Sequence, residues 1–256
     1  MRSASLIFGI LLAVVLPSAA SGQAATPAVV PFGAGERANY QVRLGGVIVG
    51  RGSMEVLGIR TVDGRPTYHT RFRVAGGVPL ARVDDTFESW IDVVGLFSRR
   101  FMQDQKEVRF QRRRAFDFFP ERRIFRRTDE SGETGTLPTD QPLDDVSFLY
   151  YARTLPLRVG ETYTLNRYFK ESGNPVVLQV LRRETVRVPA GTFQTVVVRP
   201  IIRTKGLFSQ GGEAEVYFTD DARRILVQMR SKVPVVGSLT LHLQDYRAGQ
   251  AYSSPR

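Results

Sequence analysis

The stretch Ser238-Leu239-Thr240-Leu241-His242-Leu243-Gln244 decides the fold class. Its three leucines alternate with polar residues, so they fall on one face of an extended chain. Such alternation is typical of a β-strand with one buried face. Similar segments, separated by Gly, Pro or Asp, precede it: Val176–Arg187, Phe193–Thr204, Glu213–Thr219 and Ile225–Lys232.

The N-terminal half continues the pattern. Tyr40, Val42 and Leu44 alternate with polar residues before a Gly-Gly turn, and Asp63-Gly64 is a strong two-residue hairpin signal. Further strands are expected at Thr67–Val74, Thr86–Val93, Phe116–Phe119 and Ile124–Arg127. Hairpin-length connections between so many strands predict a mainly β protein. We expect a curved antiparallel sheet, or a barrel-like one, with one short central helix.

That helix is predicted over Asp144–Arg153. Val146, Leu149, Tyr150 and Arg153 follow helical spacing, Asp144 is a capping acid, and Pro156 ends the segment. The stripe of large side chains favours packing on the sheet over a cofactor site. We interpret residues 25–256 as one β domain, with 129–143 as a loop between two halves.

Residues 1–24 have the features of a secretory signal peptide. Arg2 precedes the eleven-residue apolar run Leu6–Leu16, and small residues follow it. The run is shorter than the roughly 20 residues that span a bilayer. No cysteine follows that could carry a lipid anchor. We therefore expect a soluble exported protein of the periplasm or extracellular space, not a lipoprotein, without a transmembrane segment after cleavage.

Four motifs along the chain resemble one family. They are Gly35-Glu36 with Tyr40, the helix pattern Asp145-x-Ser147-Phe148-Leu149-Tyr150-Tyr151-x-Arg153, Val188–Phe193, and Phe218-Thr219-Asp220-Asp221-x-x-Arg224. In this order they resemble the DUF3108 family, from about Phe32 to about Tyr246. The resemblance implies an exported β protein of the cell envelope. It supplies no catalytic residue, because the family's function is unknown.

Catalytic and metal-binding patterns are scarce. The chain has no cysteine and only His69 and His242, and it lacks Gly-x-Ser-x-Gly and phosphate-binding loops. We expect no metal, no cofactor and no enzyme activity. Both histidines lie in strand patterns, and Trp90 is expected in the core.

Two catalytic alternatives stay open but weak. Ser147 follows an acid on the predicted helix, but both histidines lie far from it in the sequence. A hydrolase could use paired carboxylates. The three pairs, however, fit a strand edge, a helix cap and a turn better: Asp84-Asp85, Asp144-Asp145 and Asp220-Asp221.

The segment 99–127 is strongly basic, with ten arginines and one lysine against four acids. Phenylalanines alternate with these arginines, whose guanidinium groups suit phosphate and carboxylate. Export disfavours nucleic acid, so we expect a lipid or another anionic envelope component as partner. A solvated β-ribbon is the simpler alternative. The candidate surface consists of Arg109, Arg112, Arg113, Arg114, Arg122, Arg123, Arg126 and Arg127.

The sequence therefore supports three hypotheses. The first is a non-enzymatic envelope protein that binds a hydrophobic or anionic amphiphilic ligand such as lipid. The second is an interaction module that docks on an envelope complex through the arginine-rich segment. The least favoured is a carboxylate-based hydrolase.

Overall fold

The computed structural model describes residues 28–78, 81–107, 110–202, 214–233 and 237–253. The expected signal peptide and Arg109 lie outside these residues. Within them, fourteen strands form one sheet in which every paired neighbour is antiparallel. This confirms the predicted fold class, a mainly β protein with one central helix.

The strands of the first half form a meander of consecutive hairpins. They are β1 (Arg37–Leu44), β2 (Val47–Val62), β3 (Arg65–Val78), β4 (Ala81–Asp92), β5 (Ser98–Glu107), β6 (Phe110–Phe119), β7 (Ile124–Arg127) and β8 (Thr134–Thr136). A 3-10 turn, η1 (Pro120–Arg122), connects β6 to β7. β5 is the one long strand of this half that the sequence patterns did not predict, and β8 lies inside the expected loop 129–143.

The second half follows the single α-helix, α1 (Asp145–Ala152). Its strands are β9 (Thr162–Leu165), β10 (Val176–Val188), β11 (Gly191–Ile201), β12 (Glu215–Thr219), β13 (Leu226–Val233) and β14 (Gly237–Arg247). A second 3-10 turn, η2 (Glu171–Gly173), lies between β9 and β10. β10 to β14 agree closely with the predicted segments.

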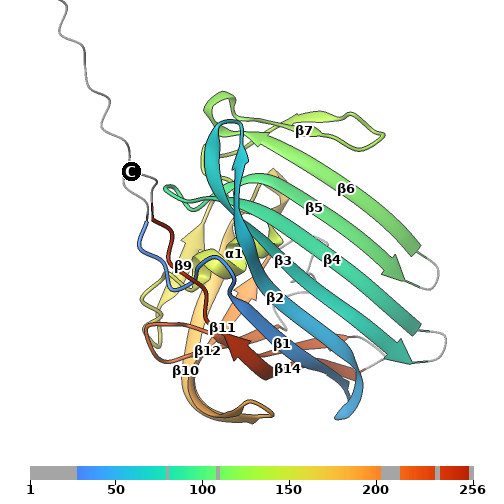
Figure 1. The fold of residues 1–256 in the computed structure, drawn as a ribbon, viewed down its shortest axis with the longest axis vertical. Coiled ribbons are helices and arrows are strands. Elements are labelled where there is room, and N and C mark those ends of the chain that lie inside the picture. Colours follow the sequence, from blue (N-terminus) through green and yellow to red (C-terminus); the bar gives the residue numbers. More distant parts are fainter. Residues whose placement is uncertain (1–27, 79–80, 108–109, 203–213, 234–236, 254–256) are drawn as a thin grey trace, which may run out of the picture.

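The two halves join through the first and last strands, because β1 pairs with β14. The strand order is β8-β7-β6-β5-β4-β3-β2-β1-β14-β13-β12-β11-β10-β9, so β8 and β9 are the edges and the sheet does not close into a barrel. The sheet curls strongly, with α1 between the β2–β4 side and the β10–β11 side (Figure 1). We call the face toward α1 the inner face and the opposite one the outer face.

The core fills the inner face. On β14, Leu241 and Leu243 are buried whereas Gln244 is exposed, as the alternation predicts. Seven of the eight residues of α1 are buried, including the polar Asp145 and Ser147. The helix therefore sits inside the curl instead of lying on one side of the sheet, and its polar residues need partners there.

Candidate functional site

The N-terminus of α1 holds a buried polar cluster. Asp144 is its N-cap, and one carboxylate oxygen accepts hydrogen bonds from the backbone N–H groups of Val146 and Ser147 at 2.8 Å each. The other oxygen accepts from Ser89 Oγ at 2.6 Å and Ser98 Oγ at 2.5 Å. Burial raises the pKa of Asp144, although these bonds favour the ionised form. The expected capping role of Asp144 is confirmed.

Asp145 points to different partners. Its carboxylate accepts from Tyr168 Oη at 3.3 Å and from Gln103 Nε2 at 3.4 Å. Burial, and then the neighbouring charge of Asp144, raise the pKa of Asp145 to about 7. Both carboxylates are fully buried, and neither faces a solvent-accessible substrate position.

A second buried cluster joins two of the family motifs. Arg153, at the end of α1, forms a two-pronged ion pair with Glu36, with N···O distances of 2.6 and 3.1 Å. Arg153 Nη2 also donates to the backbone carbonyls of Pro31 and Arg223. Tyr246 Oη on β14 donates to Glu36 at 3.0 Å. The pair therefore connects the end of the helix to the segment before β1 and to β14.

Aromatic rings enclose this ion pair. The Arg153 guanidinium lies 5.4 Å from the ring centre of Phe32 and 5.5 Å from that of Tyr150. These two rings contact each other edge to face at 4.8 Å. Tyr40 Oη, on the adjacent strand, donates to the Leu226 carbonyl at 3.0 Å. The motif residues meet in a structural cluster that presents no reactive group to solvent.

The other aspartate pairs also have structural roles. Asp84 on β4 accepts two hydrogen bonds from Arg73, at 2.9 and 3.0 Å. Asp220 binds Arg183 at 2.6 Å and Arg224 at 3.0 Å in the turn after β12. The three aspartate pairs therefore lie on a strand, at a helix cap and in a turn, as predicted from the sequence.

The arginines predicted to form one surface lie on two faces. Arg114 pairs in register with Gln103, which contacts α1, so Arg114 and its alternate neighbour Arg112 lie on the inner face. Arg113 lies on the outer face and is exposed. Because a strand alternates its side chains, three consecutive arginines cannot share a face.

The remaining candidates surround the β6–β7 turn. Arg122 and Arg126 stack over Phe119, at 4.4 and 5.8 Å from its ring centre. Arg123 is exposed and has a left-handed backbone conformation at the end of η1. Arg127 is neutralised by Asp129 at 2.7 Å and Glu133 at 3.3 Å. Only part of the arginine-rich segment is therefore uncompensated.

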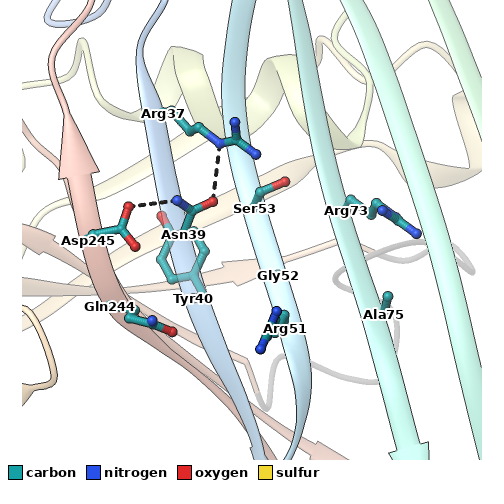
Figure 2. Close-up of a pocket in the computed structure, with 10 residues that line it drawn as sticks. All are labelled: Arg37, Asn39, Tyr40, Arg51, Gly52, Ser53, Arg73, Ala75, Gln244 and Asp245. Atoms are coloured by element: carbon teal, nitrogen blue, oxygen red, sulfur yellow. Dashed lines mark hydrogen bonds between the residues drawn. The ribbon is translucent and has the colours of Figure 1, made fainter.

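Two open grooves lie on the sheet. One of about 980 Å³ lies between β5, β6 and the segment after β7, and its lining includes Arg100, Met102, Arg113 and Asp129. The other, of about 440 Å³, crosses β14, β1, β2 and β3 (Figure 2).

The second groove mixes basic and acidic groups. Figure 2 shows Asn39 between Arg37 and Asp245, donating to the Asp245 carboxylate at 2.6 Å. Arg51 and Arg73 lie on the neighbouring strands (Figure 2). Acidic groups therefore neutralise part of the positive charge of this groove.

A row of planar side chains on the outer face was not predicted. His69, Trp90 and Arg100 are paired in register on β3, β4 and β5. The His69 and Trp90 rings stack at 4.2 Å, and Arg100 lies 5.7 Å from the Trp90 ring centre. His69 Nε2 contacts Glu88 at 2.8 Å. Trp90 is buried, as expected, but it lies on the face opposite to Phe87 and outside the main hydrophobic cluster.

Across the described ranges, His, Asp and Glu side chains form no group of three or more that could hold a metal ion. No helix in that part of the chain has the length and apolar character needed to cross a membrane.

Comparison with known proteins gives one family and a shared fold. The model of the family described as "Protein of unknown function (DUF3108)" matches residues 39–244. The crystal structure of the beta-barrel-like protein of the domain of unknown function DUF1849 from Brucella abortus is similar, with a TM-score of 0.54 and 13% identity. The match covers 87% of this chain and 100% of that one.

A Bacteroides fragilis protein with a YmcC-like fold aligns less well, with a TM-score of 0.32 and 10% identity. That alignment covers 87% of this chain and 100% of that one. No curated protein matches the sequence. At 13% identity the Brucella abortus structure shows a similar fold and nothing more.

Proposed function

The chain belongs to the DUF3108 family, and we propose that it is a non-enzymatic, exported cell-envelope protein that binds an anionic amphiphile such as a lipid. Export is supported by the basic residue, apolar run and small residues within 1–24. The absence of a following cysteine favours a soluble product over a lipoprotein.

The uncompensated positive charge on β6, η1 and β7 carries the proposal. Five of the candidate arginines have no carboxylate partner within the described chain, although most arginines elsewhere have one, as Arg153 does. Guanidinium groups next to phenylalanine rings suit a ligand with an anionic head and an apolar body. The five are Arg113, Arg114, Arg122, Arg123 and Arg126.

The placement of the carboxylates supports a non-enzymatic role. Asp144 and Glu36 are buried and fully engaged in hydrogen bonds. A hydrolase would need two carboxyl groups on either side of an accessible substrate bond. Asp84 lies on β4 and Asp220 in the turn after β12, and each is held by an arginine.

Docking on an envelope complex is the second candidate function. The outer groove beside Arg113 favours it, because it combines exposed charge with the apolar Met102. Changing Arg112, Arg113 and Arg114 together to Glu should abolish co-purification of such a complex. Unchanged partners would contradict docking.

Native mass spectrometry of the mature protein, purified gently from the envelope fraction of its host, tests the main proposal. A bound lipid-like mass supports the carrier function. A mass of protein alone, together with no uptake from added lipid, contradicts it. The measured mass also tests export, because signal cleavage between Ala20 and Ala25 removes a defined number of residues.

A further inference from the structure

Arg114 lies on the inner face of β6 beside α1. Its register partner Gln103 donates to Asp145 of the helix. Two residues further along the same face, Phe116 is almost fully buried and packs against Phe169 with ring centres 5.2 Å apart. The Arg114 side chain is half-buried, so its charge is only partly hydrated.

Lys170 reaches the same place from the opposite side of the curl. Its ammonium lies 5.3 Å from the ring centres of both Phe116 and Phe169. The loop is fixed by Asn174, whose side chain accepts from Tyr168 N at 2.9 Å and donates to the Tyr168 carbonyl at 3.0 Å. Lys170 is therefore held in position before any ligand arrives.

These two cations have no direct ionic partner in the described chain. Neither Arg114 nor Lys170 forms an ion pair with any described residue. Burial and then nearby positive charge lower the pKa of both groups, with Arg112 acting on Arg114 and Arg114 acting on Lys170. The more distant carboxylates of Asp129, Glu133 and Asp145 offset this lowering only in part. Half-buried like charges next to each other destabilise the fold unless an anion neutralises them.

We propose that Arg114 and Lys170 form an anion-binding subsite on the inner face that holds the carboxylate or phosphate headgroup of the ligand. The guanidinium offers a two-pronged contact and the ammonium a point charge. Phe116 and Phe169 form the base of the subsite and exclude water from one side. This inference rests on the proposed function, to which it adds the position and the chemistry of the headgroup.

Calorimetric titration with three probes tests the subsite. Dodecyl phosphate supplies both head and tail, inorganic phosphate the head alone, and dodecyl maltoside a tail with a neutral head. We expect the wild type to bind dodecyl phosphate most tightly. Arg114→Gln and Lys170→Met should each weaken this binding at least about tenfold, the equivalent of about 1.4 kcal/mol. Arg187→Gln is the control, because it removes the same charge from an exposed position on β10, away from the arginines that carry the proposed function.

The outcomes separate this inference from the proposed function. If the wild type binds dodecyl phosphate and both inner variants bind equally well, the subsite is wrong and the amphiphile function stands. If inorganic phosphate binds as tightly as dodecyl phosphate and depends on Arg114, the subsite stands and the amphiphile function fails. If neither phosphate probe binds, or if Arg187→Gln weakens binding as much as Arg114→Gln, the subsite is overturned.

A second variant guards against a simple loss of folding. Lys170→Arg keeps the charge above the two rings, so its affinity should stay within about threefold of the wild type. Circular dichroism melting of each variant shows whether it is folded. A folded Lys170→Arg protein that binds as poorly as Lys170→Met would contradict a role for the charge.

Discussion

The region around α1 and the region of β6 and β7 both combine charged and aromatic side chains. In the first region the buried charges form an ion pair, whereas in the second several arginines form none with any described residue. Around the helix, Arg153 and Glu36 are only 2% and 3% exposed and neutralise each other. On β6, Arg113 and Arg114 have no acidic partner in the described chain. Buried charge that is fully partnered maintains the fold, whereas charge that is left without a partner is available to a ligand. This difference predicts opposite responses to the loss of an arginine.

Loss of Arg153 should cause the largest decrease in the free energy of unfolding. Arg153→Met leaves Glu36 buried without its partner and frees two backbone carbonyls. Breaking such a pair costs about 3–5 kcal/mol of the free energy of unfolding. Urea unfolding followed by circular dichroism measures this loss. Arg223→Met is the control, because the Arg223–Asp221 pair is largely exposed and worth about 0–1 kcal/mol. Equal losses in the two variants would contradict the structural role of Arg153.

Loss of the Asp144 carboxylate should cause the second-largest decrease in the free energy of unfolding. Asp144→Ala removes the helix N-cap, worth about 1 kcal/mol. It also removes the carboxylate acceptor of the Ser89 hydroxyl and one of the two acceptors of the Ser98 hydroxyl, which keeps Ser147 Oγ, at about 1–3 kcal/mol. We expect a total loss of about 2–4 kcal/mol in urea unfolding. Asp144→Asn keeps an oxygen for the helix N–H groups and should lose less. A loss as large as that of Ala would show that charge, rather than capping, is what the site needs.

Sequence patterns predicted those features of this region that depend only on neighbouring residues in the chain. The alternating leucines of β14 and the capping acid Asp144 need only neighbours along the chain, so both predictions are confirmed. The ion pair of Arg153 with Glu36 joins residues 117 positions apart, and no periodicity reports such a distance. Residue pairs that are set by the register of the fourteen-stranded sheet therefore could not be predicted from local patterns.

The arginine-rich strands show a different limit. β5 was not predicted, because its residues toward α1 include the polar Ser98 and Gln103 as well as Phe101, which removes the apolar alternation. The division of Arg113 and Arg114 between two faces does follow from the period of a strand. Treating the segment as one cluster therefore missed a signal that was present. The contribution of Lys170 could not be seen, since it lies 56 positions beyond Arg114.

Asp145 should make the stability of the region around α1 depend on pH. Its pKa is raised to about 7 from 3.8, so the folded state keeps a proton that the unfolded state releases. The free energy of unfolding should therefore fall as the pH rises from about 4 to about 7, and then level off. Asp145→Asn cannot ionise, so it should flatten this slope and be more stable than the wild type near pH 7. Urea unfolding across this pH range measures both effects.

Asp84 provides the control of opposite sign. Its pKa is lowered by the hydrogen bonds from Arg73, so its contribution is present above the unfolded pKa and is lost as the pH falls below it. Asp84→Asn should leave the slope between about pH 4 and about pH 7 unchanged. A wild type with flat stability over this range, or an Asp145→Asn variant that keeps the slope, would show that Asp145 is ionised in the fold.

The smallest expected effect has the opposite sign to that of Arg153. Arg114→Gln removes a half-buried cation whose positive charge acts on Lys170. Relief of like-charge repulsion should therefore leave the free energy of unfolding unchanged or raise it by up to about 1 kcal/mol at low salt. Urea unfolding at low and high salt tests this, because screening by salt should reduce any gain. A loss comparable to that of Arg153→Met would mean that Arg114 maintains the fold, and the contrast between the two regions would disappear. A gain combined with weaker binding of dodecyl phosphate would instead identify Arg114 as a residue kept for its ligand at the expense of stability.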